Sequence, residues 1–323
     1  MSHPVHPSAG RESPGRLVWR SFRRNRPAVL GLAVVLGFFV VALVGVALTR
    51  GAHPVLDPRE VRLPDRLQGP FARPNRAAVP AASLPRLGIY PFGTDELGRD
   101  VFARMLEGAF VSLSVGFVAV GLAVAIGIAL GGLAGYYGPV RLGIGRVRLL
   151  TVDTLITGLI DVMLSFPTFF LILTVVAIRR PSIWNIMVVI GLTTWEGPAR
   201  FVRAEILSLR EQEFIHAARA GGAPGWRVIA GHLIPNSLAP VLVSATLGVA
   251  GAILLESSLS FLGFGVPPPD ATWGNILAGG RGYIFDASWL TLIPGTAILV
   301  VVLAFNLFGE GLREAFNPRL REG

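Results

Sequence analysis

The sequence lacks cysteine and lysine altogether and is poor in charged residues. Without cysteine the chain has no disulfide, no thiolate nucleophile and no cysteine-ligated metal site. Without lysine it has no GxxxxGK[ST] phosphate loop, so it does not hydrolyse ATP by that route. Any active transport by this protein therefore draws its energy from another subunit or from an ion gradient.

The composition is that of a membrane protein. Of the 323 residues, 52% are hydrophobic and only 15% are charged, and the mean hydropathy is +0.60. Such values are typical of polytopic membrane chains. All 29 basic residues are arginines, and the formal net charge is +9. The arginines form short clusters between apolar runs, which favours the flanks of membrane spans over a nucleic-acid-binding surface.

No catalytic or metal-binding constellation is evident. The absence of a nucleophile with its base, or of a carboxylate pair, argues against a membrane-bound enzyme. The histidines have no spacing typical of metal ligands, so a metal site within this chain is not expected. They are His3, His6, His53, His216 and His232.

Six apolar runs predict an all-α polytopic membrane protein with six transmembrane helices. A bilayer core of about 30 Å needs roughly 20 residues of helix. The first run is longer than the core of a signal peptide, and we interpret it as a retained anchor. The runs are 28–48, 109–134, 159–178, 183–199, 237–261 and 289–308.

The distribution of arginines orients these spans. The tail, the loops 136–158 and 200–235 and the C-terminus together hold 17 arginines, whereas the short connections on the opposite face hold 3. Both termini are therefore predicted to be cytoplasmic. The chain then divides into a cytoplasmic tail with an interfacial approach (1–27), a first transmembrane helix (28–48), an extracytoplasmic loop (49–108), a core of five transmembrane helices (109–309) and a cytoplasmic C-terminal tail (310–323).

Two local features predict how the spans are shaped and packed. Gly127, Gly131 and Gly135 recur at a spacing of four and so share one helix face, which permits close helix packing. The alternative is that glycine is simply frequent in membrane helices. Pro167 is expected to kink the third run or to break its hydrogen-bond ladder.

A polar segment, 205–235, lies between the fourth and fifth runs and is predicted to face the cytoplasm. Five of its residues recur at every fourth position, which indicates a helix. Gly222 indicates a sharp turn after that helix. Pro224 indicates the start of a short second helix, which ends at Pro235. Ala217 and Ala218 give the surface of the first helix very little side-chain bulk at this point, so another protein can approach it closely. A short amphipathic helix on the bilayer is the alternative. The spacing-of-four positions are Glu205, Leu209, Glu213, Ala217 and Gly221.

Several blocks of sequence resemble one family of membrane permeases. Segment 205–235 resembles the EAA-type loop of ABC importer permeases, whose coupling helix docks into the ATPase subunit. Nearly the whole chain from about Leu17 resembles the dipeptide/oligopeptide/nickel permease family in its C-type member. The blocks are GTDELGRDVFARMLEG (93–108), GYYG (135–138), ARFVRAEILSLREQEFIHAARAGG (199–222), LSFLGFGVPPP (259–269), TWGNIL (272–277) and AFNLFGEGLREAFNPR (304–319).

The loop departs from the family pattern at two points. Gly221 stands where the family usually has leucine, which leaves two glycines at which the turn could fall. Ile234 precedes Pro235 where leucine is usual. Neither change removes a charge or adds bulk, so the resemblance still implies ATPase coupling through Glu213, Ala217, Ala218, Gly222 and Pro235. Glu213 is the candidate for a charge-assisted contact with the ATPase.

The resemblance also implies the rest of the assembly. The expected fold is that of a type I ABC importer permease in a bacterial inner or plasma membrane. The expected partners are a paralogous B-type permease in a heterodimer, two ATP-binding subunits, an extracytoplasmic solute-binding protein and the lipid bilayer, with no nucleic acid. The chain itself is expected to be no enzyme and to hold no cofactor, because ATP and magnesium are bound by the ATPase subunits.

Charged residues within the apolar runs are costly and are therefore functional candidates. Glu256 lies well inside the fifth run beside Ser257, and the two are candidates for the translocation pathway, near the amino end of a peptide or a cation. The alternative is a polar contact between helices that fixes their packing. Asp161 and Glu196 lie near the cytoplasmic ends of their runs and are expected to be interfacial.

The long loop carries a block of mixed charge that matches the family. This block suits either contact with the binding protein or internal closure of the loop against the bundle, and we favour internal closure. Its residues are Thr94, Asp95, Gly98, Arg99 and Asp100.

The predicted function is import of dipeptides or oligopeptides, with half of the pathway formed by this chain. Nickel or another small solute is the alternative cargo, because the systems that this chain resembles include carriers of peptides and carriers of nickel. A secondary transporter without ATPases is a further alternative. It would require an internal inverted repeat and more ionisable residues at mid-membrane, and neither is evident.

Overall fold

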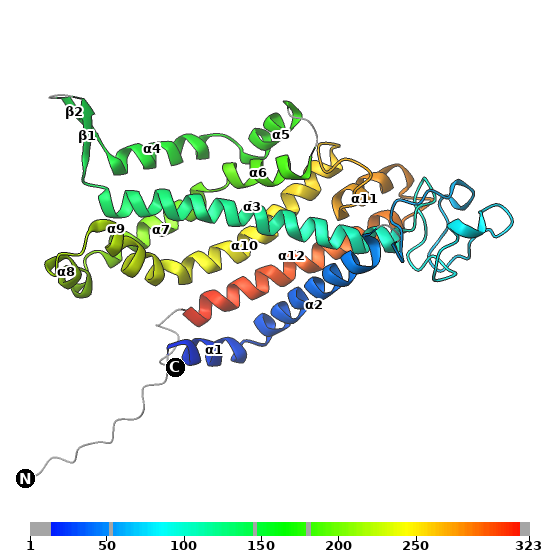
Figure 1. Cartoon of the computed structure of the whole chain (residues 1–323), viewed down its shortest axis with the longest axis horizontal. Coiled ribbons are helices and arrows are strands. Elements are labelled where there is room, and N and C mark those ends of the chain that lie inside the picture. The colour runs from blue at the N-terminus through cyan, green and yellow to red at the C-terminus, as the bar shows by residue number, and fades with distance from the viewer. Residues whose placement is uncertain (1–13, 52–53, 145–146, 179–181, 317–323) are drawn as a thin grey trace, which may run out of the picture.

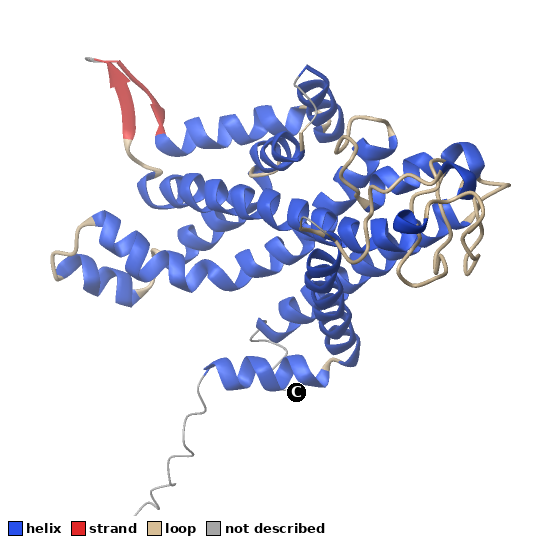
Figure 2. Cartoon of the chain, turned by 45° about the vertical axis from the view of Figure 1, so that its right-hand side comes forward, coloured by secondary structure: helices blue, strands red, loops and turns tan. Residues whose placement is uncertain are grey.

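The computed structural model describes residues 14–51, 54–144, 147–178 and 182–316. The first part of the predicted N-terminal tail, residues 1–13, and the end of the C-terminal tail, residues 317–323, lie outside the described residues. The described chain is a helical bundle with an irregular cap at one end (Figures 1 and 2).

Four helical runs are long and apolar enough to cross a membrane. Figure 1 shows that they extend along the long axis of the molecule. They are α2 (Arg26–Thr49), α3 (Val101–Tyr137), the run Gly225–Phe261 and α12 (Trp289–Phe316). The third run joins α9 (Gly225–Val228), the π-helical turn η3 (Ile229–Leu233) and α10 (Ile234–Phe261).

A fifth candidate span is bent. The helices α4 (Val152–Ser165) and α5 (Thr168–Ile178) pass the same test together, but their axes differ by 82°. Pro167 lies at the break and has no N–H for the hydrogen-bond ladder. The predicted break of the third run at this proline is therefore confirmed.

The fourth predicted run, 183–199, is not one helix. Its residues form α6 (Ile183–Thr193) and the beginning of α7 (Glu196–Leu209), separated at Thr194 and Trp195. The described residues thus contain four candidate spans and one bent pair, and the fourth predicted run is divided between two shorter helices.

The second long helix begins earlier than predicted. Hydropathy places its start at residue 109, but α3 begins at Val101, because Asp100 caps it by accepting a hydrogen bond from Phe102 N–H at 2.9 Å. The charged residues of its first turns have partners of opposite charge or polarity: Glu107 is buried and accepts a hydrogen bond from Ala271 N–H at 3.2 Å, and Arg104 Nε lies 3.6 Å from Asp95 Oδ2. Hydropathy alone cannot anticipate such paired charges, so the predicted boundary of the loop 49–108 was wrong.

The predicted glycine face of α3 packs against α7. A Cβ atom added at Gly127 would lie 2.6 Å from Pro198 Cβ, and one added at Gly135 would lie 2.8 Å from Ile206 Cβ. These distances are shorter than any ordinary contact, so only glycine allows α7 to approach α3 this closely. The prediction of close packing at these glycines is confirmed.

The cap of residues 54–100 is held by buried polar groups, although it contains only the short turns η1 (Leu63–Asp65) and η2 (Ala81–Ser83). Tyr90 Oη donates to Asp65 Oδ2 at 2.6 Å, and Thr94 Oγ1 donates to the Asp65 carbonyl oxygen at 2.5 Å. Asp95 accepts from Arg99 Nε at 2.7 Å. These contacts lie within the cap, so they agree with internal closure of the block around Thr94.

The remaining elements lie at the two ends of the bundle. The amphipathic helix α1 (Pro14–Arg24) precedes α2 and occupies part of the predicted interfacial approach. The strands β1 (Arg141–Ile144) and β2 (Val147–Thr151) pair in antiparallel fashion after α3. The helix α11 (Trp273–Gly280) and the turn η4 (Arg281–Tyr283) connect α10 to α12.

Candidate functional site

The polar segment 205–235 lies at the end of the bundle opposite the cap. In Figure 1, α8 (Glu213–Ala220) and α9 lie at the left-hand end, whereas the cap lies at the right-hand end. Of the residues predicted for coupling, Glu213, Ala217, Gly222 and Pro235 are exposed and Ala218 is half-buried. Four of the five residues are therefore accessible from outside the chain.

The predicted continuous helix through 205–221 is wrong. The structure ends α7 at Leu209 and begins α8 at Glu213. Ile206 and Ile215 are both fully buried in one cluster with Val202 and Val228. Nine residues along an α-helix amount to about two and a half turns, so a continuous helix would place the two isoleucines on opposite faces. The break lets both enter the same core.

The turn after α8 falls at Gly222. This residue has a φ of +80°, whereas Gly221 keeps an ordinary helical φ of −74°. The Gly222 N–H donates to the Arg219 carbonyl at 3.0 Å, and the Ala223 N–H donates to the Ala218 carbonyl at 3.1 Å. This is the Schellman arrangement, in which the residue after the helix cap is left-handed. Of the two glycines, the structure requires only Gly222.

Pro235 does not end the short helix, contrary to the prediction. The helical run is continuous from Gly225 to Phe261, and Pro235 lies in the first turn of α10. The preceding π-helical turn changes the hydrogen-bond pattern, with the Ile234 N–H donating to the Ile229 carbonyl. Such a turn accommodates a residue that lacks an N–H. Segment 225–233 is therefore a direct extension of the long helix α10.

Three contacts attach the polar segment to the C-terminal end of α3. The Arg219 guanidinium lies over the Tyr136 ring, 4.8 Å from its centroid. Arg210 Nη1 donates to the Gly135 carbonyl at 3.2 Å. A Cβ atom added at Gly225 would lie 2.5 Å from Tyr137 Oη. These contacts were not predicted from the sequence, although the GYYG block, which takes part in all three, is one of the blocks that resemble the family.

An ion pair connects α7 to α4. Arg203 Nε donates to Asp153 Oδ1 at 2.5 Å, and Arg203 Nη2 donates to Asp153 Oδ2 at 2.7 Å. Both side chains are about 30% exposed, at 28% and 32%. The bidentate geometry fixes the orientation of the two helices. Sequence reasoning missed this pair because 50 residues separate its members.

Glu256 is fully buried between helices. Its Oε1 accepts a hydrogen bond from Ser260 Oγ at 2.7 Å, and its Oε2 lies 3.5 Å from Ser112 Oγ of α3. Ser112 Oγ also accepts from the Trp273 N–H of α11 at 3.2 Å. The carboxyl group therefore links α10, α3 and α11, as the packing alternative for this residue requires. Ser257 is buried as well.

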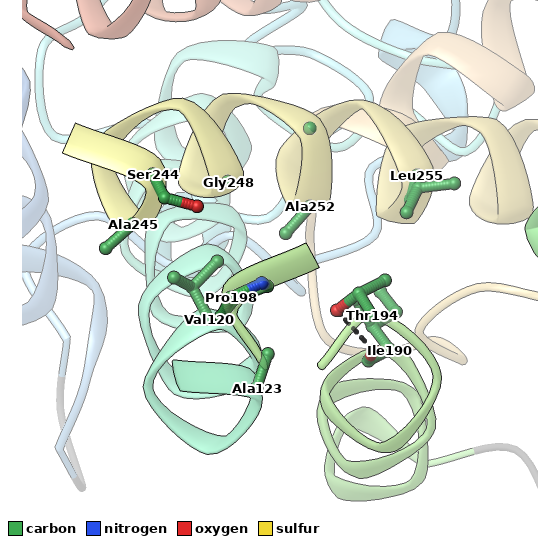
Figure 3. A pocket seen from close by; sticks show the side chains of 11 residues that line it. Val120, Ala123, Ile190, Thr194, Pro198, Ser244, Ala245, Gly248, Ala252 and Leu255 are labelled. Atoms are coloured by element: carbon green, nitrogen blue, oxygen red, sulfur yellow. Dashed lines mark hydrogen bonds between the residues drawn. The ribbon is translucent and has the colours of Figure 1, made fainter. Parts of the chain in front are cut away.

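A cavity of about 190 Å³ lies among α3, the α6–α7 break and α10. Figure 3 shows side chains from these helices pointing into it. Thr194 and Ser244 supply its polar side chains, and Thr194 Oγ1 is occupied by a hydrogen bond to the Ile190 carbonyl at 2.8 Å. The other lining residues are small or apolar, and no charged residue is among them. Glu256 and Ser257 do not line this cavity; Ser257 lines a separate apolar groove.

Apolar helices long enough to cross a membrane, with an exposed helical loop at one end, place the described chain in the class of polytopic membrane proteins. The chain matches two families: the binding-protein-dependent transport system inner membrane component over residues 127–322, and the N-terminal TM domain of oligopeptide transport permease C over residues 13–70. The protein belongs to the family of binding-protein-dependent transport system inner membrane components.

Relatives match over most of the chain. A dipeptide transport system permease protein of Alkalihalophilus pseudofirmus is 39% identical, covering 96% of this chain and 91% of the relative. A di/tripeptide transport system permease protein of Pseudomonas aeruginosa is 36% identical, covering 98% and 95%. Among solved structures, a chain of the MetNI methionine ABC transporter in an inward-facing conformation matches 67% of this chain and 98% of its own length with a TM-score of 0.52. At 18% identity this last likeness shows the fold alone.

Proposed function

We propose that this chain is the permease subunit of an ATP-driven importer and forms half of the pathway for dipeptides or oligopeptides. The observation that carries the proposal is the similarity to peptide permeases over more than nine-tenths of the chain. The chain has no lysine and hence no phosphate loop, so ATP and magnesium are bound by partner subunits. The chain itself is not an enzyme.

The coupling surface is assigned to α8 and the turn after it. Glu213 stands exposed in the first turn of α8, and Ala217 lies about one turn further along the helix with only a methyl group as its side chain. Phe214 and Trp226 add exposed aromatic side chains, 43% and 64% accessible, beside it. An exposed surface of this kind suits a groove on an ATPase subunit, with Ala218 and Gly222 allowing close approach and Pro235 extending the loop into α10.

Movement at this surface reaches the bundle through short connections. The segment continues without interruption into α10 on one side and joins α7 through three residues on the other. The buried cluster around Ile206 and Ile215 makes the loop and both helices one packed unit. Displacement of α8 by an ATPase therefore tilts α7 and α10 together, as rigid-body transport motions require.

The membrane topology follows from the same assignment. We assign α6 and the beginning of α7 as the fourth span in chain order, broken at Thr194, and the bent pair α4–α5 as the third. Both termini and α8 face the cytoplasm, and the cap of residues 54–100 faces outward. A B-type permease completes the pathway, two ATPase subunits bind at α8, and an extracytoplasmic binding protein delivers peptide to the cap side of the bacterial inner membrane.

The cavity at the α6–α7 break is the part of the pathway that this chain contributes. Its lining offers apolar and small residues and no charge, which suits cargo whose side chains vary. Glu256 then fixes the helices around the pathway, and Ser257 lies on the neighbouring face of α10. The break itself supplies a point at which the wall of the cavity can move.

Reconstitution tests this proposal. The full chain is co-expressed with the neighbouring transporter subunits, and the complex is purified through a tag on this chain and placed in liposomes with ATP inside. Two ATP-binding subunits are expected to co-purify, and uptake of a labelled dipeptide is expected only with ATP and the binding protein. Peptide uptake driven by a proton or sodium gradient without ATPase subunits would contradict it.

A further inference from the structure

We infer that α1 is an interfacial helix whose arginines bind the headgroups of anionic phospholipids. The inference does not depend on what the protein transports. It rests on the placement of charge on α1, on how α1 is fastened to the ends of two spans, and on the apolar surfaces that continue from it.

The arginines of α1 lie on one side of the helix. Arg16, Arg20, Arg23 and Arg24 fall within an arc of roughly 100° on an α-helical projection. Val18 and Phe22 fall on the opposite side. The arginines therefore form one basic side of α1, from which guanidinium groups can reach phosphate groups of lipid headgroups.

The apolar side of α1 is packed against the end of α12. Phe22 is only 3% exposed and meets the Phe308 ring edge-on, with centroids 5.8 Å apart. Ala28 at the start of α2 packs directly against Gly311 of α12, because a Cβ atom on the glycine would overlap the alanine side chain. The position of α1 relative to α2 and α12 is therefore determined by packing, and Figure 2 shows α1 turning away from the direction of α2.

The remaining surface of α1 combines charge with exposed apolar groups. Leu17 and Trp19 are 39% and 54% exposed on either side of the arginine arc. Leu36 and Val40 continue an exposed apolar surface along α2, at 55% and 60%. Because tryptophan and arginine are favoured at the boundary between headgroups and acyl chains, this surface fits the edge of the bilayer where α2 enters it.

A hollow beside α1 offers places for a headgroup. It is lined by Ser21, Arg24, Asn25, Arg26, Pro27 and Glu314. The carboxylate in this hollow, Glu314, accepts a hydrogen bond from Asn25 Nδ2 at 2.6 Å. The other acid at the end of α12, Glu310, is paired with Arg313 at 2.6 Å. Positive charge therefore predominates over the described surface around α1, as an anionic partner requires.

The absence of cysteine makes a site-specific test direct. The variant Leu17→Cys gives the chain a single thiol, which is labelled with a fluorophore after the full chain has been placed in nanodiscs. Quenching of the label is compared between brominated phosphatidylglycerol and brominated phosphatidylcholine at equal mole fractions. We expect the anionic lipid to be enriched around the label about five-fold or more, since one such charge contributes about that factor near a membrane surface.

Charge variants identify the origin of any enrichment. Replacing Arg16, Arg23 and Arg24 by glutamine is expected to reduce the quenching ratio to about one, whereas replacing them by lysine retains it. A matched control replaces the exposed arginines Arg66, Arg73 and Arg76 of the cap by glutamine and is expected to leave the ratio unchanged. The lysine variant also shows whether a loss in the glutamine variant comes from charge or from misfolding.

Three results would overturn the inference. Equal quenching by the two lipids in the unaltered background would show that α1 has no preference for anionic headgroups. Removal of the preference by inorganic phosphate in solution would identify a site for soluble anions. A label that neither lipid quenches would place the arginine side of α1 in the aqueous phase, where a protein surface is the remaining partner.

Discussion

The Arg219 guanidinium lies 4.8 Å from the centroid of the Tyr136 ring, so that a cation from α8 covers an aromatic residue near the end of α3. This contact joins the exposed loop to a helix other than the two it connects in sequence. A cation–π contact of this kind contributes about 0.5–1 kcal/mol at an exposed site.

The first prediction concerns this contact. Tyr136→Leu is expected to lower peptide uptake per ATP hydrolysed about two- to five-fold, because α8 loses part of its attachment to α3. Tyr136→Phe keeps the ring and is expected to retain coupling. The ratio of uptake to ATPase activity in proteoliposomes measures the effect, and equal ratios for the two variants would contradict it.

The two glycines after α8 are expected to differ. Gly222 has a φ of +80°, so Gly222→Ala imposes a strain of about 1–2 kcal/mol on the turn. Gly221 has an ordinary φ, and a Cβ atom added there by Gly221→Ala would lie 3.4 Å from its nearest neighbour, the Ala217 carbonyl oxygen. We expect the first variant to lose substrate-stimulated ATPase activity and the second to keep it. Gly222→Asp, which adds charge as well as strain, should abolish uptake while membrane insertion persists.

The close approach of α3 and α7 predicts that substitutions at two glycines of α3, Gly131 and Gly121, have different effects. Gly131→Val would drive a side chain into Val202 and Arg203 of α7, costing about 1–3 kcal/mol or more through overpacking. Gly121→Val is a matched control on the same helix, because a Cβ atom there meets nothing within 4 Å. Thermal melting in detergent should separate the two variants, and similar melting temperatures would argue against the packing.

Glu256 is expected to act through packing. Glu256→Gln keeps an acceptor for the Ser260 hydroxyl and should leave the complex assembled, whereas Glu256→Ala leaves buried hydroxyls unpaired at a cost of about 1–3 kcal/mol. Size-exclusion chromatography of the co-expressed complex measures assembly. Loss of uptake in an intact Glu256→Gln complex would instead favour a role in the pathway.

The carboxyl group of Asp100 is expected to make the stability of the folded state depend on pH. Burial raises the pKa of this carboxyl to about 6, against the lowering influence of the Phe102 N–H and Arg62. The folded state thus binds the proton more tightly than the unfolded state. Stability is therefore expected to fall as the pH rises from about 4 to about 6, by up to about 3 kcal/mol from this group.

The measurement is a series of melting curves between these pH values. Asp100→Asn keeps an oxygen to cap α3 and should remove this contribution, so that the variant gains most at neutral pH. Asp100→Ala also loses the cap and should be less stable than Asp100→Asn at every pH by about 1 kcal/mol. An unchanged pH profile in Asp100→Asn would show that other groups cause the dependence.

Much of this protein could be predicted locally. Uninterrupted apolar runs indicated the spans now seen as α2, α10 and α12, the glycines at 127, 131 and 135 indicated a close contact, and Pro167 indicated the break between α4 and α5. The polar segment 205–235 was located by its own residues and by family resemblance. Each of these signals lies within a few turns of chain, where helix geometry relates spacing directly to a face.

Other features depended on residues far apart in the chain. Ile206 and Ile215 can share a core only if the helix between them breaks, and Arg203 meets Asp153 only because α7 packs on α4. The early start of α3 depends on a cap and on partners for its charges. The sequence by itself thus determined the membrane class, most of the spans and the place of the polar segment 205–235. Apart from the break at Pro167, only the tertiary structure decided where helices break and which buried charges are paired, because these depend on neighbours that spacing does not reveal.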